Sequence, residues 1–128
     1  MNSKEIVTRA FVVKDNKVVL LWRYWKSKQY YIPAGGNIDE GETPEQAIIR
    51  ELKEELSIDC VITKKLAVIE EPLKTIHLFL CSYQKGVLKL GADEKQKITP
   101  DNQRKIATLS LSSIQGRDVY FKEYLTQF

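Results

Sequence analysis

The chain has 128 residues, of which 43% are hydrophobic and 29% are charged, and its formal net charge is +3. These values predict one globular domain over residues 1–128 and exclude a disordered tail, a collagen-like rod and a long heptad fibre. No apolar run approaches the roughly 20 residues that a membrane helix needs, and the first residues lack a secretion signal. We therefore expect a cytoplasmic protein with no membrane contact, in which Cys60 and Cys81 are buried free thiols.

The first part of the chain is expected to form three strands. Residues 5–13 and 17–25 are rich in β-branched and apolar side chains, and the turn residues between them predict a hairpin. Residues 30–33 form a third, short strand. The pair Gly35-Gly36 follows, and two adjacent glycines predict an unusual backbone path at this point.

The strongest local signal is a helix that begins after Thr43 and ends at about Leu56. Thr43 can cap the helix, Pro44 suits the first helical position, and Gln46 completes a capping box. One face of this helix is apolar and predicts contact with the core. The residues of that face are Ile48, Ile49, Leu52 and Leu56.

Three carboxylates, those of Glu51, Glu54 and Glu55, share an adjacent sector about 100° wide on the same helix. Like charges three and four residues apart destabilise a helix by roughly 0.2–0.5 kcal/mol per pair. A divalent cation such as Mg²⁺ or Mn²⁺ would relieve this repulsion, because hard cations prefer oxygen ligands. The alternative is a plain acidic face in contact with solvent.

The second half of the chain returns to strands. Further strands are expected over 61–70, 75–83 and 105–110, with short helices from near Ser112 and over 120–126. Residues 84–104 are polar and contain glycine and proline, so they predict a hairpin end and a long loop. This mixture of elements predicts an α/β fold in which helices pack on a sheet.

Residues 36–58 resemble the Nudix box, in which a glycine and a glutamate precede an Arg-Glu-x-x-Glu-Glu-x-Gly segment. The matching positions are Gly36, Glu42, Arg50, Glu51, Leu52, Glu54, Glu55 and Ile58. The strands on either side fit the family's order, so the resemblance implies a Nudix-like α/β/α sandwich with a mixed β-sheet between helices. Ser57 stands where the family has glycine, which predicts a modest stability cost or a different exit from the helix.

The resemblance also implies a metal-dependent catalytic site. Mg²⁺, or Mn²⁺ in its place, would be bound by Glu51, Glu54, Glu55 and the backbone carbonyl of Gly36. Arg50, paired with Glu42, would orient the carboxylates and belong with them to the catalytic group. Water would attack a phosphorus atom, and Glu54 or Glu55 would be a candidate to accept its proton.

The family often adds a glutamate from a loop just before the last strand. At the corresponding place this sequence has an amide, Asn102 or Gln103. Asp101 is adjacent, and Glu94 lies earlier in the same loop, so either acid is a possible loop base. The sequence does not distinguish between them.

Substrate-binding residues are expected near residues 22–31, where aromatic side chains concentrate. Trp25 and Tyr31 can stack on a base, and Arg23 can bind a phosphate. The Gly35-Gly36 backbone completes this set. The alternative is that the aromatic side chains fill the two faces of a hairpin.

The implied function is MutT-like cleavage of a pyrophosphate bond in a nucleoside triphosphate or another nucleoside diphosphate derivative. The alternatives are a hydrolase of ADP-ribose, a nucleotide sugar or a dinucleoside polyphosphate, and a Nudix-like module that binds a nucleotide without cleaving it. The expected partner is thus a nucleotide-type small molecule. Nucleic acid is not expected, because the acidic helix would repel its backbone, and a homodimer is compatible with the sequence.

Overall fold

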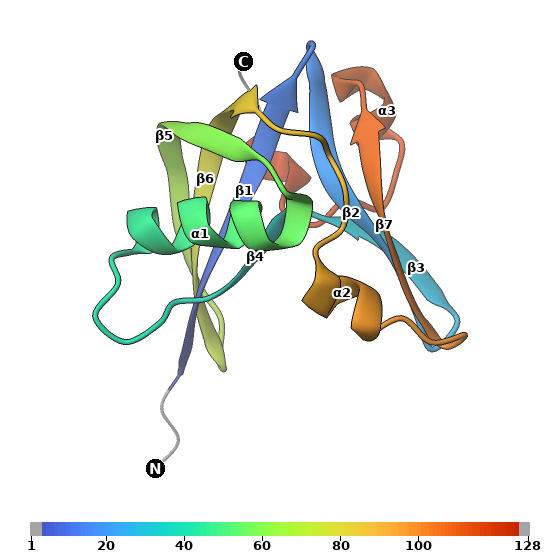
Figure 1. Ribbon diagram of the computed structural model, residues 1–128, viewed down its shortest axis with the longest axis horizontal. Coiled ribbons are helices and arrows are strands. Elements are labelled where there is room, and N and C mark those ends of the chain that lie inside the picture. The colour runs from blue at the N-terminus through green and yellow to red at the C-terminus, as the bar shows by residue number, and fades with distance from the viewer. Residues whose placement is uncertain (1–3, 126–128) are drawn as a thin grey trace.

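A computed structural model describes residues 4–125 (Figure 1). Seven strands lie in this part of the chain: β1 (Glu5–Lys14), β2 (Lys17–Trp25), β3 (Lys28–Ile32), β4 (Ala34–Asn37), β5 (Asp59–Glu70), β6 (Lys74–Lys85) and β7 (Asn102–Leu109). The helical elements are α1 (Pro44–Leu56), α2 (Ala92–Gln96), α3 (Leu111–Gln115) and the 3-10 turn η1 (Lys122–Tyr124).

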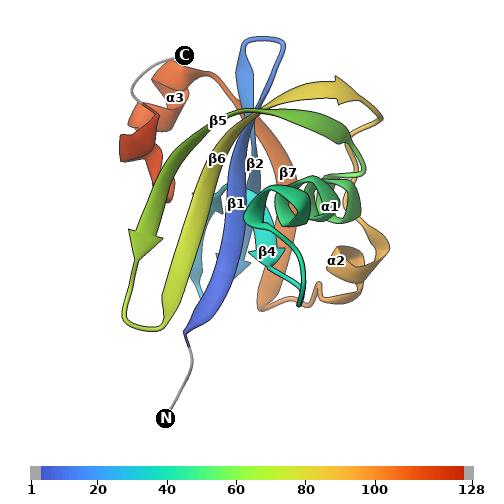
Figure 2. The ribbon, with the colours of Figure 1, turned by 90° about the vertical axis from the view of Figure 1, so that its left-hand side faces the viewer.

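All seven strands belong to one mixed sheet. Its path is β3-β2-β1-β6-β5, while β4 pairs with β1 and β7 pairs with β2. Strands β1 and β6 run parallel, and the other named pairings are antiparallel. Figure 2 shows β5, β6 and β1 side by side, with α1 to the right of β1.

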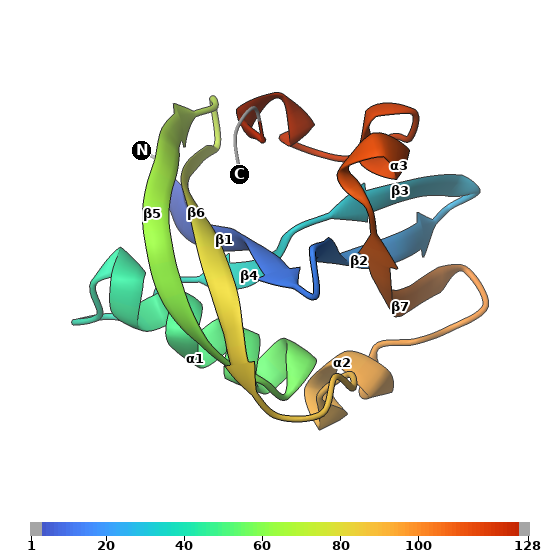
Figure 3. The ribbon, with the colours of Figure 1, turned by 90° about the horizontal axis from the view of Figure 1, so that it is seen from above.

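Helices cover both faces of the sheet, as the predicted α/β/α sandwich requires. Figure 3 shows α1 and α2 on one side of the strands and α3 on the other. Each side has its own buried cluster. The cluster under α1 includes Val12, Val19, Ile48, Leu52, Leu56 and Phe79, and the cluster under α3 includes Phe11, Leu20, Leu78, Leu80 and Ile114.

Helix α1 has the predicted start. The Thr43 hydroxyl accepts a hydrogen bond from the Gln46 N–H over 3.1 Å, and the Gln46 side chain accepts one from the Thr43 N–H over 3.0 Å. At the other end Ser57 has φ 65°, so it adopts the left-handed conformation that a glycine would adopt there. The exit from the helix is therefore the ordinary one, and the expectation of a different exit is wrong.

Three expectations need correction. Residues 84–104 are not one long loop, because α2 forms within them and β7 begins at Asn102. A helix of five residues depends on tertiary packing, which composition does not reveal. Residues 34–37 form a strand paired with β1, which the sequence did not predict. The unusual backbone expected at Gly35 is confirmed, because its φ is +155° and a Cβ there would lie 1.9 Å from the carbonyl oxygen of Thr8 in β1. At the C-terminus the helical turn spans only residues 122–124, and residue 126 lies outside the described residues.

The helices in residues 4–125 are too short or too polar to cross a membrane.

Candidate active site

The C-terminal half of α1 packs its carboxylates against the backbone of β4. Glu55 is buried, with 7% of its surface exposed, and its Oε2 accepts a hydrogen bond from the Gly35 N–H over 3.0 Å. A Cβ at position 36 would lie 2.8 Å from the Glu51 carboxylate, so any other residue here would force that carboxylate to shift. The side chain of Glu54 is 59% exposed and faces solvent. The two glycines thus bring main-chain atoms directly against two of the three glutamates.

Arg50 of α1 forms hydrogen bonds both with Glu42, which precedes the helix, and with two glutamates of the helix itself. Its Nε and Nη2 donate to the two oxygens of Glu42 over 2.7 and 2.8 Å, a bidentate pair that lowers the pKa of Glu42 to about 2. Its Nη1 donates to Glu51 over 3.0 Å and to Glu54 over 3.1 Å. Since the Glu42 pair fixes the guanidinium, Arg50 orients two of the box glutamates from one position.

Glu55 carries the most perturbed carboxylate of the site. Its pKa is raised to about 8, mainly by burial and also by the negative charges of Glu94 and Glu51, while the positive charge of Arg9 opposes the rise. Glu94 comes from α2, and its side chain is only 12% exposed in an ion pair with Arg104 of β7. The site therefore gathers carboxylates from two separate helices around one buried group.

The donor chemistry of this group suits a hard divalent cation. Among residues 4–125, no three acidic, histidine or cysteine side chains are already arranged as a metal-ligand group, and Glu51 and Glu54 both accept hydrogen bonds from Arg50. The crowding around Glu55 nevertheless fits a cation, because oxygen ligands and the neutralisation of a buried carboxylate are what Mg²⁺ or Mn²⁺ supplies. The side chains of Glu51, Glu54 and Glu55 and the Gly36 carbonyl would hold it.

Comparison with known proteins agrees with this arrangement. The NUDIX domain profile matches residues 4–114. The chain belongs to the NUDIX domain family. Its fold matches the crystal structure of a NUDIX family hydrolase from Clostridium perfringens with a TM-score of 0.74 at 15% identity, covering 97% of this chain and 93% of that one. At this identity the structural match supports the fold.

Two relatives carry named activities of their own. The 8-oxo-dGTP diphosphatase of Proteus vulgaris is 33% identical over 84 residues, which cover 62% of this chain and 75% of that protein. The ADP-ribose pyrophosphatase of Methanocaldococcus jannaschii is 30% identical over 98 residues, which cover 71% of this chain and 58% of that protein. A Caenorhabditis elegans relative is matched over 29% of its length. The chain thus spans less than two thirds of two of these three proteins.

Within this Nudix domain, two of the expected substrate residues lie on the face of the sheet that bears α1. Arg23 of β2 is paired with Arg104 of β7, and its Nη2 donates to the Asn102 side chain over 3.1 Å. Trp25 follows on the same face at the end of β2 and is 43% exposed. Both side chains therefore lie on the same side of the sheet as Glu94, although Arg23 is held by Asn102.

Tyr31 and Asp101 are not brought to the carboxylates. Tyr31 packs against the cluster under α3, on the opposite face, and its hydroxyl accepts a hydrogen bond from Arg117 over 3.4 Å. Side chains alternate along a strand, so Tyr30 instead faces the same way as Arg23. Asp101 is exposed in the turn before β7, where its carbonyl accepts a hydrogen bond from the Lys26 N–H. Of the two possible loop acids, only Glu94 lies beside Glu55.

Sequence reasoning missed Arg9, which lines a cavity of about 110 Å³ beside β4. Arg9 is paired with Gly35 across β1 and β4, and its Nη1 donates to the Pro33 carbonyl over 2.8 Å. The rest of the lining is mostly apolar and aromatic, with two further charged residues: Val7, Ile32, Glu71, Lys74, Ile76, Tyr120 and Phe121. A charged residue in the middle of an apolar strand was the signal that could have revealed it.

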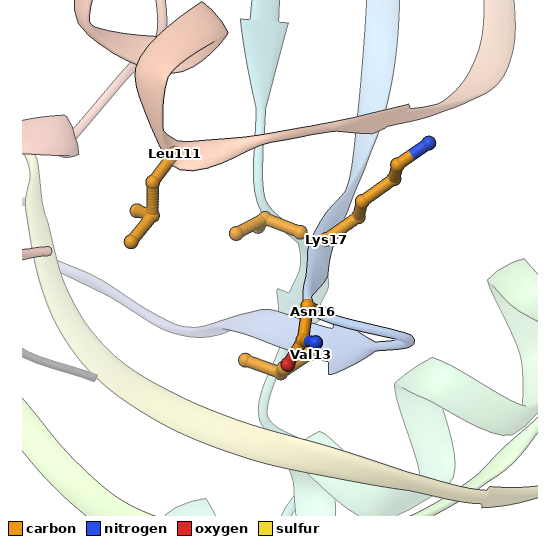
Figure 4. A pocket seen from close by; sticks show the side chains of 5 residues that line it. Val13, Asn16, Lys17 and Leu111 are labelled. Atoms are coloured by element: carbon orange, nitrogen blue, oxygen red, sulfur yellow. The ribbon is translucent and has the colours of Figure 1, made fainter.

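A larger cavity, of about 230 Å³, lies elsewhere, between the β1–β2 turn and the start of α3 (Figure 4). Val13, Asn16, Lys17, Val18 and Leu111 line it. None of the site carboxylates is among these residues, nor among those that line a neighbouring cavity of about 290 Å³, which are Lys14, Asp15, Lys17, Leu88 and Thr108.

Proposed function

We propose that this Nudix domain is a divalent-metal-dependent pyrophosphohydrolase that converts a nucleoside triphosphate into a nucleoside monophosphate and pyrophosphate. The proposal rests on the environment of Glu55. Its buried carboxylate accepts a hydrogen bond from the Gly35 N–H and lies close to the negative charges of Glu51 and Glu94. Burying a charged carboxylate costs free energy unless a partner compensates its charge, and a bound cation would do so.

Each residue of the site has its own role in the proposed reaction. When bound, Mg²⁺ would neutralise phosphate charge and lower the pKa of water. Arg50 holds Glu51 and Glu54 in place, and Gly36 leaves room for the Glu51 carboxylate against the backbone. Glu54 is the most exposed of the box glutamates and is therefore our proton acceptor. The water oxygen attacks phosphorus, its proton passes to Glu54, and the anhydride P–O bond breaks to release pyrophosphate.

The cavity beside β4 supports the proposal that the substrate carries a nucleoside next to its phosphates. At about 110 Å³ it is smaller than the roughly 300–1,000 Å³ that encloses a whole drug-sized ligand, so it suits one ring system. Tyr120 lines it and stacks on Tyr30 at 4.9 Å, which offers an aromatic surface to a base. Arg9 adds hydrogen-bond donors on the same wall, next to Glu55 through Gly35.

ADP-ribose is the second candidate substrate, because a matched archaeal relative is an ADP-ribose pyrophosphatase. The Proteus vulgaris relative, an 8-oxo-dGTP diphosphatase, supports the triphosphate instead. We also place the protein in the cytoplasm, which the two buried free thiols Cys60 and Cys81 support, since a reducing compartment keeps such thiols free.

Product analysis tests the proposal. Nucleoside triphosphates, their oxidised forms, ADP-ribose and a dinucleoside polyphosphate would be incubated with Mg²⁺ or Mn²⁺ and either wild type or Glu54→Gln. Release of pyrophosphate from a triphosphate by wild type alone supports the proposal. Cleavage of ADP-ribose alone would replace the substrate class. Metal-dependent nucleotide binding with no cleavage would replace the hydrolase with a nucleotide sensor.

A further inference from the structure

Arg9 lies between the box glutamates and the aromatic cavity beside β4. On one side it is paired with Gly35, whose N–H donates to the Glu55 carboxylate. On the other side its half-buried side chain lines the cavity together with Tyr120 and Phe121. A substrate that extends from the carboxylates into the cavity must therefore pass the Arg9 guanidinium.

The charge of Arg9 is within electrostatic reach of two box glutamates. Burial lowers the pKa of Arg9, whereas the negative charges of Glu55 and Glu51 raise it. Arg9 acts in turn on Glu55, where its positive charge opposes the rise in the pKa of that carboxylate. A phosphate bound beside these glutamates would thus lie close to the same positive charge.

Folding alone does not account for Arg9. It stands in β1 between Val7 and Phe11, two buried apolar residues of the same strand face. A guanidinium has five N–H donors, yet within residues 4–125 this side chain makes one hydrogen bond, from Nη1 to the Pro33 carbonyl over 2.8 Å. Taking a guanidinium out of water for a single hydrogen bond costs free energy, which an apolar side chain would avoid. The unused donors point to an anionic ligand.

We infer that Arg9 binds the phosphate group that is attached to the nucleoside, at the passage from the metal-binding carboxylates to the cavity. The inference rests on the proposed function and deepens it, because it assigns a place to the phosphate that remains on the monophosphate product. Arginine suits this place, since its planar guanidinium can donate two parallel hydrogen bonds to phosphate oxygens. The contact is present both before and after the anhydride bond is cleaved.

The test compares calorimetric binding of the four nucleoside monophosphates with that of their free nucleosides, alongside steady-state kinetics on the triphosphates. Mn²⁺ binding is measured by electron paramagnetic resonance without nucleotide. The variants are Arg9→Met, which removes the charge and the donors, and Arg9→Lys, which keeps the charge. Arg117→Met is the matched control, because the exposed Arg117 also lies beside a tyrosine of β3, 5.8 Å from the Tyr31 ring, but on the face that bears α3.

Wild type is expected to bind a monophosphate more tightly than its nucleoside. Arg9→Met should weaken monophosphate binding by about 10–150-fold, the range for a hydrogen bond to a charged group, and leave nucleoside binding unchanged. KM for the triphosphate should rise by a similar factor at nearly constant kcat, because the contact is made in the ground state too.

Mn²⁺ should bind Arg9→Met at least as tightly as wild type, since a positive charge near Glu55 has been removed. A residue that merely supported the glutamates would show the opposite. Arg9→Lys should keep part of the monophosphate affinity, and Arg117→Met should match wild type in every measurement.

Equal losses of affinity for monophosphate and nucleoside would overturn the inference, since Arg9 would then contact the base or support the cavity. Weaker Mn²⁺ binding in Arg9→Met would overturn it as well. If Arg9→Met does not fold, wild type and Arg9→Lys carry the test, because a wild type that binds nucleoside and monophosphate equally has no phosphate contact.

The two proposals can fail separately. A protein that binds a monophosphate through Arg9 but cleaves no triphosphate keeps the inference and refutes the proposed function. Triphosphate cleavage with an unchanged KM in Arg9→Met keeps the proposed function and refutes the inference.

Discussion

Gly91 lies so close to Glu54 that a side chain at position 91 would overlap the Glu54 carbonyl oxygen, with a Cβ only 1.8 Å from it. This contact joins α2 to the end of α1, and a hydrogen bond from the Gly91 N–H to the Glu55 carbonyl reinforces it. The position of Glu94 beside the box glutamates therefore depends on the absence of a side chain three residues earlier.

Gly91→Ala should displace α2 and weaken the site. The overlap involves backbone on both sides, so no flexible side chain can absorb it, and we expect a loss of about 1–3 kcal/mol in the free energy of unfolding. Mn²⁺ affinity should fall with it, because the overlap also displaces the backbone of Glu54 and Glu55. Gly116→Ala is the control, since the nearest atom to a Cβ there is 3.9 Å away. Equal urea midpoints and equal Mn²⁺ affinities for the two variants would contradict this account.

Glu54→Gln should abolish most turnover and leave the fold intact. The side chain is 59% exposed, so the amide is accommodated, but it can neither accept a proton nor bind a cation as a carboxylate does. We expect kcat to fall by at least about 100-fold, the range typical of a lost acid–base group. Glu45→Gln, an exposed change on the first turn of the same helix, should retain kcat. Unchanged turnover in Glu54→Gln would refute its assignment to the site.

Metal-free protein should lose stability as the pH rises from about 5 to 8. The pKa of Glu55 is raised from 4.5 to about 8 in the folded state, so between these values the folded protein keeps a proton that the unfolded chain has released. The unfolded state is then favoured as protons are removed. Glu55→Gln lacks this proton and should show a flatter dependence.

The measurement is urea unfolding at several pH values in a chelator. Adding Mg²⁺ should stabilise wild type more at pH 8 than at pH 6, because metal binding favours the ionised carboxylate. Parallel stability curves for wild type and Glu55→Gln in the chelator would show that Glu55 titrates normally.

Local signals were enough to predict the parts of the fold that short-range physics determines. The Thr43 capping box and the apolar stripe through Ile48 and Leu52 determine where α1 begins and which face it buries, and the structure agrees. The predicted strand over 17–25 is also found, as β2 (Lys17–Trp25), paired with β1 in the expected hairpin. These features depend on residues a few positions apart.

The rest depends on contacts between distant segments. Glu94 meets Arg104 only because α2 packs on the end of α1, and no local pattern encodes that packing. Tyr31 and Arg23 were likewise expected in one substrate-binding set, because they are close in sequence, but they lie on opposite faces of the sheet. Tyr31 turned out to face α3, where the chain after α3 adds a bridge through Val119.

Variants of Ser57 measure how much the absence of the box glycine changes the free energy of unfolding. At φ 65° a serine is strained by about 1–2 kcal/mol relative to glycine, but its hydroxyl donates to the Lys89 carbonyl over 2.9 Å. Such a hydrogen bond contributes about 0.5–1.5 kcal/mol. Ser57→Ala keeps the strain and loses the bond, so it should destabilise the protein by about 1 kcal/mol.

Ser57→Gly loses the same bond but also the strain, so its unfolding free energy should lie within about 1 kcal/mol of wild type. Urea denaturation of the three proteins separates the two contributions, because the alanine variant isolates the hydroxyl and the glycine variant adds the backbone. Turnover should be equal in all three, since the Ser57 side chain contacts a carbonyl of the segment before α2 and none of the glutamates. A glycine variant less stable than the alanine variant would mean that the left-handed conformation carries no strain here.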